Sequence, residues 1–273
     1  MAPDGTEAFI EECRERAARY PNSAIARAAQ AFMQASTPER YSYNFSWLGR
    51  PIIQYPQDIV AMQELIWRVK PDLIIETGIA HGGSLILSAS MLALLDYAEA
   101  SETGEVLDPS QTRRRVLGVD IDIRAHNLAA IKAHPMSNRI EMLQGSSIEP
   151  EIIADVRKRA ASFHRILVSL DSNHTHAHVL LELNAYAPLV SMGSYCVVFD
   201  TIVEDLPGDM YPDRPWSRGN SPKTAVWEYL REVAAEGRVG ADGVALAFEV
   251  DSELEAKLVM TVAPDGYLRR VPK

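Results

Sequence analysis

Short apolar runs alternate with amphipathic segments along most of the chain, from about residue 56 to residue 235. Each run is short enough for a buried strand, and the segments between them repeat their apolar residues at helical spacing. The pattern predicts strands at residues 73–75, 116–121, 139–143, 165–170 and 195–199. It predicts helices at residues 56–68, 82–96, 125–133, 149–162, 175–187 and 222–235. Strands and helices that alternate in this way form a parallel, doubly wound sheet.

The two ends of the chain depart from this alternation. Residues 7–35 are rich in Ala, Glu, Arg and Gln and predict a helix that Pro21 divides into two. The aromatic segment 41–47 predicts a packed connector that either seals a core or forms the wall of a pocket. Near the C-terminus, residues 244–250 and 257–263 predict an antiparallel hairpin at one sheet edge.

The expected fold is therefore α/β. It has a doubly wound, mostly parallel, seven-stranded Rossmann-like sheet with an N-terminal helical extension. We expect two parts, a helical and aromatic extension over residues 1–55 and one domain over residues 56–273.

Composition and charge exclude several classes of protein. The 273 residues are 47% hydrophobic and 23% charged, which excludes disordered and coiled-coil classes. The net charge of −10 would repel the phosphates of a nucleic acid, so we expect no nucleic-acid partner. The sequence contains no apolar stretch of about 18 residues and no apolar leader, so we expect no membrane partner. Two cysteines, Cys13 and Cys196, without a CxxC motif favour a cytoplasmic location.

Ligands of doubly wound sheets bind beyond the carboxyl ends of the strands, so residues that follow each strand are the candidate site. After the first strand come Glu76, Gly78, Gly82 and Ser84, in a glycine-rich turn before a helix. This turn either binds a nucleotide-like ligand or is simply a tight turn. The turn lacks the GxGxxG motif of a nicotinamide-dependent oxidoreductase. A carboxylate such as Glu76 favours a ligand with an ammonium group or a hydroxyl.

Two further strand ends carry residues suited to a nucleoside. Asp120 follows the second strand, where a carboxylate can accept hydrogen bonds from both ribose hydroxyls. Ser146 follows the third strand, in a short polar run that suits an adenine edge or caps the next helix.

The fourth and fifth strands end in acids that suit a metal ion. Asp171 follows the fourth strand, and Asp200 and Glu204 follow the fifth. Oxygen ligands without thiolates favour Mg²⁺. His174 lies nearest the fourth strand end and is the candidate general base. Zinc bound by His174, His176 and His178 is a weaker alternative, because these three histidines do not share a helix face.

In this order of strand-end residues the chain resembles class I S-adenosylmethionine (SAM)-dependent methyltransferases. More narrowly, it resembles the family of cephalosporin hydroxylase (cephalosporin 7-methoxylation) proteins and rhamnosyl O-methyltransferases. The resemblance spans about residues 44–230 and is carried by these stretches: NFSWLGRPIIQYPQDI, KPDLIIETGIAHGGSLILSASML, VLGVDIDIRAHN, DSNHTHAHVLLELNAYAPLV and GSYCVVFDT.

The resemblance implies a SAM site and a Mg²⁺ site beside the sulfonium. The SAM site would be made by Glu76, Gly78, Gly82, Ser84 and Asp120, with Ser146 and Asp171 beside them. The family pattern has an acidic pair at the end of the fifth strand, and here that pair reads Phe199-Asp200. Water, Asn173 or Glu204 would then complete the ligand set of Asp171 and Asp200, or the metal is weak or absent.

The expected activity is SAM-dependent O-methylation of a sugar or another hydroxylated natural product, assisted by Mg²⁺. Asp171 and His174 are the expected catalytic residues, and the long segment 201–221 is the expected acceptor loop. A SAM-binding partner subunit without catalysis and a metal-dependent hydrolase are the alternatives. The Ala-rich N-terminal helices and the resemblance together imply a homo-oligomer.

Overall fold

The structure is a computed structural model in which residues 5–273 are described. Its N-terminal part contains two helices, a 3-10 helix and a small antiparallel pair of strands. These are α1 (Gly5–Ala17), α2 (Ala24–Ser36), η1 (Tyr41–Asn44), β1 (Phe45–Trp47) and β2 (Arg50–Ile52). The expected boundary between residues 55 and 56 stays a prediction.

Seven strands form the central sheet within residues 5–273. They are β3 (Leu73–Thr77), β4 (Arg115–Asp120), β5 (Ile140–Gln144), β6 (Ile166–Leu170), β7 (Tyr195–Val198), β8 (Phe248–Val250) and β9 (Tyr267–Arg270). Their order across the sheet is β5-β4-β3-β6-β7-β9-β8. Strands β3 to β7 are parallel, whereas β9 is antiparallel to both β7 and β8. The expected mostly parallel, seven-stranded sheet is confirmed.

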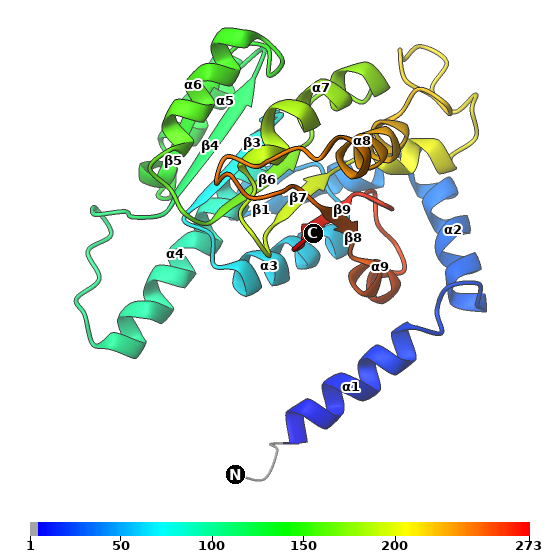
Figure 1. Cartoon of the computed structure of the whole chain (residues 1–273), viewed down its shortest axis with the longest axis horizontal. Helices are drawn as coiled ribbons and strands as arrows, with labels where there is room; N and C mark the ends of the chain where they lie inside the picture. Colours follow the sequence, from blue (N-terminus) through cyan, green and yellow to red (C-terminus); the bar gives the residue numbers. More distant parts are fainter. Residues whose placement is uncertain (1–4) are drawn as a thin grey trace.

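Helices cover both faces of this sheet (Figure 1). The remaining elements are α3 (Pro56–Val69), α4 (Gly83–Thr103), α5 (Ala125–Lys132), η2 (Ser137–Arg139), α6 (Pro150–Ala160), α7 (His176–Tyr186), η3 (Ala187–Leu189), η4 (Thr201–Asp205), α8 (Pro222–Glu236) and α9 (Ser252–Leu258). Successive strand residues point to opposite faces. Leu167 of β6 therefore packs with α3 and α4, and its neighbour Val168 packs with α6, α7 and α8.

The end of the chain corrects one expectation. Residues 257–263 are not the second strand of a hairpin, because helix α9 occupies residues up to Leu258. The Asp251 carboxylate accepts a hydrogen bond from Leu254 N at 2.9 Å and so caps this helix. The segment that follows bonds to buried Asp58 instead of to a strand, through Val262 N at 3.0 Å. The strand that pairs with β8 is β9, which starts at Tyr267, ten residues after the predicted start at residue 257.

The aromatic segment seals the core. Tyr41 packs against Phe45 and Tyr55, with ring centroids 5.1 and 5.4 Å apart. The Trp47 indole donates a hydrogen bond to Ser90 Oγ of α4 at 2.9 Å. Tyr43 is 55% exposed and is the member of this segment that stays at the surface.

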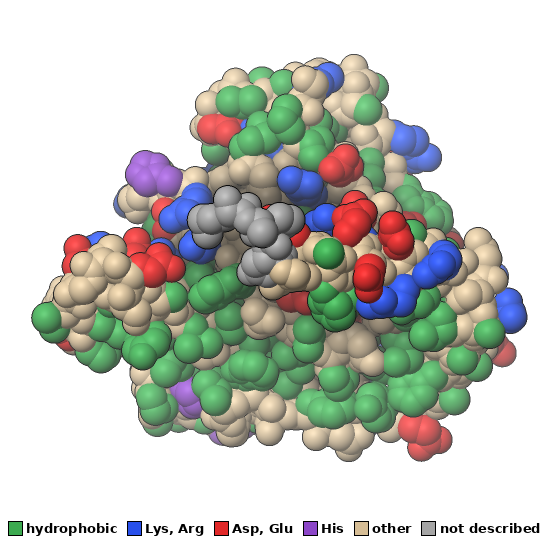
Figure 2. Space-filling model, turned by 90° about the horizontal axis from the view of Figure 1, so that it is seen from below, with side chains coloured by type: hydrophobic (Ala, Val, Ile, Leu, Met, Phe, Trp, Pro, Cys, Tyr) green, Lys and Arg blue, Asp and Glu red, His purple; other side chains and the backbone are tan. Residues whose placement is uncertain are grey.

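Helix α1 projects from the rest of the molecule (Figure 1). It leaves Phe9 60% and Ile10 44% exposed. Figure 2 shows this side of the molecule, where acidic and basic side chains gather in the upper half of the view and hydrophobic side chains spread over the lower half. Among the described residues, no helix is both long enough and apolar enough to cross a membrane.

Candidate functional site

The glycine-rich turn after β3 brings two strand ends together. Gly78 has φ +90°, and a Cβ there would overlap the backbone oxygen of Asp171. Gly82 has φ +82° and lies directly before α4, where a Cβ would overlap the Ile131 side chain. Both positions therefore need glycine, for the left-handed backbone and for the close approach. The turn sets the predicted residues Glu76 and Asp171 side by side.

Glu76 is a buried acid at this turn. Its side chain accepts a hydrogen bond from Ser84 Oγ in the first turn of α4. Burial raises the pKa of Glu76 to about 7, although the Ser84 hydrogen bond lowers it. Nearby positive charge would favour the ionised carboxylate, so the residue fits a cationic ligand group.

Asp120 fastens the same turn to β4. One of its carboxylate oxygens accepts hydrogen bonds from Ile79 N at 2.7 Å and Ala80 N at 3.2 Å. The other accepts one from Asp122 N at 2.9 Å. A carboxylate has about four lone-pair sites, so Asp120 retains acceptor capacity for a ribose hydroxyl.

Two residues that support this turn were not found from the sequence. Arg50, the first residue of β2, donates from Nε to His81 O at 3.0 Å and from Nη2 to Asn127 Oδ1 at 3.1 Å. Asn127 of α5 donates to Ala80 O at 2.9 Å. Their partners are backbone carbonyls and an amide, so spacing along the chain carried no signal for them.

Ser146 lies in the turn after β5, next to β4 in the sheet. Its carbonyl accepts a hydrogen bond from Glu149 N at 3.0 Å, which closes the turn before α6. In the sheet order β5-β4-β3-β6-β7, the carboxyl ends of these neighbouring strands carry Ser146, Asp120, Glu76, Asp171 and Asp200, in that order.

Asp171, His174 and Asp200 form a cluster at the ends of β6 and β7. One potential ligand atom from each lies within 4.8 Å of the others. His174 Nε2 is 3.2 Å from Asp200 Oδ2. Gln54 Nε2 donates to Asp171 Oδ2 at 3.2 Å, a contact that the sequence pattern did not suggest. The three residues come from two strand ends, as the predicted topology requires.

The cluster has the electrostatics of a cation site. Burial raises the pKa of Asp171 well above its ordinary range, and the nearby carboxylates of Asp200, Glu76 and Glu182 raise it further. These acids repel one another, and a divalent cation would relieve that repulsion. The two carboxylates therefore fit a hard divalent cation such as Mg²⁺, with the His174 imidazole beside them.

The alternatives for a further metal ligand, Glu204 and Asn173, accept hydrogen bonds from other groups. Glu204 Oε2 accepts hydrogen bonds from Ser221 Oγ at 2.7 Å and Gly219 N at 2.9 Å. Asn173 Oδ1 accepts from Thr175 N at 2.9 Å, before α7. The structure thus does not bring Glu204 into the cluster, because its carboxylate closes a loop. Phe199 is 5% exposed and packs in the core beneath the cluster.

The three histidines after β6 go to different partners. His176 Nδ1 lies 2.8 Å from Thr224 Oγ1 of α8. His178 Nε2 lies 3.1 Å from Ser147 Oγ and 3.6 Å from Glu182. The arrangement does not form a three-histidine zinc site among the described residues.

Residues 206–221 form a loop that folds over the cluster. The Trp216 ring meets the His174 ring edge-on, with centroids 4.8 Å apart, and the Arg214 guanidinium lies 5.1 Å from the Trp216 centroid. Tyr211 is half-buried, and burial with the nearby Asp200 charge raises its pKa to about 12. The phenol therefore stays protonated and can donate a hydrogen bond at neutral pH.

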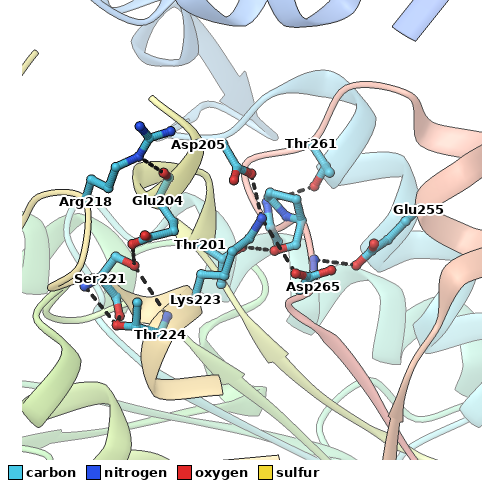
Figure 3. Close-up of polar contacts among 12 residues, drawn as sticks. Thr201, Glu204, Asp205, Arg218, Ser221, Lys223, Thr224, Glu255, Thr261 and Asp265 are labelled. Carbon is cyan, nitrogen blue, oxygen red and sulfur yellow. Dashed lines mark hydrogen bonds and ion pairs between the residues drawn. The ribbon is translucent and has the colours of Figure 1, made fainter. Parts of the chain in front are cut away.

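Both ends of this loop are fastened (Figure 3). At its start, Lys223 Nζ lies 2.6 Å from Asp205 and 3.7 Å from Asp265. At its end, Arg218 Nε donates to Glu204 O at 3.1 Å, beside the bonds that Glu204 accepts. These contacts thus hold both ends of the loop, which forms one wall of the site.

Comparisons with known proteins find one family model and several relatives that match most of the chain. The family Rhamnosyl O-methyltransferase/CmcI matches residues 39–271. The Rhamnosyl O-methyltransferase of Mycobacterium leprae (strain TN) is 27% identical over 226 residues, which cover 82% of each chain. That of Mycobacterium bovis (strain BCG / Pasteur 1173P2) is 27% identical over 214 residues, or 78% of this chain and 73% of the relative.

Solved structures agree on the fold. A structure of CmcI with Mg and SAM has a TM-score of 0.52 and 19% identity, and the match covers 84% of this chain and 77% of that one. A CmcI apo-structure has a TM-score of 0.51 and 19% identity, with 85% and 78% covered.

Proposed function

The chain belongs to the Rhamnosyl O-methyltransferase/CmcI family and is a SAM-dependent O-methyltransferase, and we propose that Asp171, His174 and Asp200 form its reaction centre. The observation that carries this proposal is the cluster itself, with ligand atoms from all three residues within 4.8 Å of one another. It lies beside Glu76, at the sheet edge where the residues that would bind SAM converge.

Glu76 and Asp120 would hold two different parts of SAM, the ammonium group and the ribose. The Glu76 carboxylate would bind its ammonium group, because the buried site raises the pKa of Glu76 to about 7 and a cation offsets that shift. Asp120 would accept a ribose hydroxyl with the lone pairs that Ile79, Ala80 and Asp122 leave. Ser146 would lie near the adenine, as its place beside β4 allows.

Asp171 and Asp200 would hold Mg²⁺, with His174 beside them. When bound, SAM supplies a methyl group on a cationic sulfur, and Mg²⁺ lowers the pKa of a hydroxyl next to it. Holding the acceptor in line with that methyl group is the task of the surrounding residues, and alignment of this kind can supply about 7–11 kcal/mol of a barrier.

His174 would take the proton of the acceptor hydroxyl at Nε2. The Asp200 carboxylate lies 3.2 Å from that nitrogen and would stabilise the protonated imidazole. The T-shaped contact with the Trp216 ring would also restrain the imidazole. General-base catalysis is typically worth about 10²–10⁴-fold in rate.

The acceptor would be a hydroxylated ring, such as a sugar or another natural product. Trp216 and Tyr211 offer an aromatic surface and a hydrogen-bond donor, a combination that suits the faces and hydroxyls of a sugar. The curated relatives are named as rhamnosyl O-methyltransferases, which supports a deoxysugar among the acceptors to test first.

The exposed N-terminal helices support assembly into a homo-oligomer. Phe9, Ile10, Ile25 and Phe32 are exposed by 39–60% on α1 and α2, and a second copy would bury them. Cys13 and Cys196 are free thiols, in keeping with a cytoplasmic protein. Light scattering on the full chain and on Phe9→Glu tests the assembly, since the variant should lower the measured mass if α1 forms the contact.

The direct test of the reaction centre is methyl transfer from labelled SAM to a panel of rhamnosyl and other sugar acceptors. His174→Ala should lower kcat by about 10²-fold or more while leaving the affinity for SAM unchanged. Near-full turnover by that variant would remove His174 from the mechanism.

A further inference from the structure

A cavity of about 900 Å³ lies at the amino-terminal ends of the sheet strands, whereas the proposed reaction centre lies at their carboxyl ends. Its walls come from the end of α6, residues 163–166, residues 188–192, residues 239–242 and Arg270. Ile166 starts β6 at this cavity, whereas Asp171 follows the end of the same strand. The volume falls within the range of small-molecule sites, about 300–1,000 Å³. The proposed methyl transfer uses none of these residues.

The walls of the cavity are joined to one another by hydrogen bonds. Ala241 N donates to Pro188 O at 2.8 Å, which links the 239–242 wall to η3. Ser191 Oγ donates to His164 O at 2.7 Å and accepts from Ile166 N at 3.0 Å. These bonds hold three wall segments in place before any ligand arrives, which reduces the entropy cost of binding.

Arg270 is a buried cation in this wall. It is 1% exposed, and its Nη1 donates to Val190 O at 2.6 Å. Its Nη2 donates to Asp242 Oδ1 at 2.8 Å and lies 3.3 Å from Val244 O. Its Nε has no hydrogen-bond partner among the residues that the structure describes. The guanidinium therefore brings a buried positive charge, paired with Asp242, into the wall of the cavity.

The charge of the lining is opposite to that of the chain. Arg157 and Arg165 join Arg270, with His164 beside them, and Asp242 is the acid that this lining contains. The chain as a whole has a net charge of −10. The remaining surface is largely apolar and includes Phe163, Leu189, Met192 and Val239.

We propose that this cavity binds a small amphiphilic anion, with a carboxylate, sulfonate or phosphate head group and an apolar body. The head group would lie among the arginines, because guanidinium groups bind such anions through paired N–H donors. The body would lie against the apolar wall and remove it from water. The cavity is a site separate from SAM and from the acceptor.

The test uses 8-anilinonaphthalene-1-sulfonate, a fluorescent anion with an apolar body, and the full chain saturated with S-adenosylhomocysteine. Two variants change the cavity from exposed positions. Arg165→Glu reverses a charge, and Ala161→Trp fills space at the end of α6. Arg124→Glu is the matched control, because its side chain is 65% exposed and lies beyond the end of β4, at the other sheet edge.

We expect the wild-type chain and Arg124→Glu to bind the probe equally well. Arg165→Glu and Ala161→Trp should each weaken binding by about tenfold or more. The affinity for N-phenyl-1-naphthylamine, which lacks the sulfonate, should be the same in wild type and in Arg165→Glu. Thermal melting checks that each variant is folded. Binding by the two cavity variants that equals wild-type binding, or an equal loss in Arg124→Glu, would overturn the proposal.

Discussion

The Trp216 and His174 rings form a T-shaped contact, with centroids 4.8 Å apart and an angle of 85° between the ring planes. The contact joins a loop residue to a residue of the reaction centre, 42 positions apart in the chain. The proposed wall of the acceptor site is therefore in direct contact with the proposed general base.

Replacing Trp216 should therefore lower turnover by releasing His174. An aromatic contact of this kind is worth about 0.5–1.5 kcal/mol, so Trp216→Ala should lower kcat by roughly twofold to twelvefold. Trp216→Phe keeps an aromatic edge and should restore most of the loss. SAM affinity, measured by calorimetry, should stay unchanged in both variants. An equal loss in the Phe variant would contradict a restraint that depends on the ring edge.

The pH dependence of SAM binding should report Glu76. Its folded pKa is raised from 4.5 to about 7, so the folded chain binds a proton that the unfolded chain has lost. This residue therefore makes folding less favourable as pH rises from about 4.5 to about 7 and adds no further change above that range. Since the ionised form binds an ammonium group, SAM affinity should rise with pH over the same range.

Glu76→Gln is the matched variant for this prediction. It should bind SAM more weakly, and its affinity should lose the rise between pH 5.5 and about pH 7 that the wild-type chain has. Titration calorimetry across this pH range checks it. A Gln variant with the wild-type pH dependence would show that another group is responsible.

Glu204 distinguishes loop closure from metal binding. Its carboxylate accepts from Ser221 Oγ and Gly219 N, so Glu204→Gln should loosen the loop that carries Tyr211 and Trp216. The acceptor KM should rise by about threefold or more, as expected for loss of a charged hydrogen bond. The affinity for Mn²⁺, used as a probe of the metal site, should not change. A large loss of Mn²⁺ affinity would restore Glu204 as a metal ligand.

A carboxylate at position 199, where the family pattern has an acid, tests whether this position can reach the metal. Phe199→Glu places a carboxylate in a position that is 5% exposed, so the variant should be less stable than wild type without metal. If the new carboxylate reaches the metal, Mg²⁺ should raise the Tm of Phe199→Glu more than that of Phe199→Gln. Equal shifts in thermal melting would mean that residue 199 lies out of reach of the cluster.

The fold was largely predictable because it follows from local patterns. Buried parallel strands read as apolar runs, and each of the five was found within two residues of its observed ends. The C-terminal hairpin was not predicted correctly because residues 257–263 are as apolar as a strand, yet they bond to Asp58, about 200 positions earlier. No window of sequence contains that contact.

The candidate site divides in the same way. That Glu76, Asp120, Asp171 and Asp200 lie near one another was predictable, because the carboxyl ends of parallel strands meet on one side of the sheet. Their roles stay a prediction. Gln54, Arg50 and Asn127 were not, since each acts through a partner that is distant in the chain. Glu204 was predicted as a metal ligand because it is an acid near a strand end. Its carboxylate instead accepts a hydrogen bond from Ser221, at the far end of the loop.

We propose that Asp171 and Asp200 hold a divalent ion that methyl transfer requires. The most direct measurement is transfer of labelled methyl from SAM after exhaustive chelation and after Mg²⁺ is added back, in wild type, Asp171→Asn, Asp200→Asn and the exposed control Asp122→Asn. We predict that chelation abolishes and Mg²⁺ restores the activity of wild type and Asp122→Asn, while the other two stay inactive. Full activity of the chelated wild-type chain would contradict the claim.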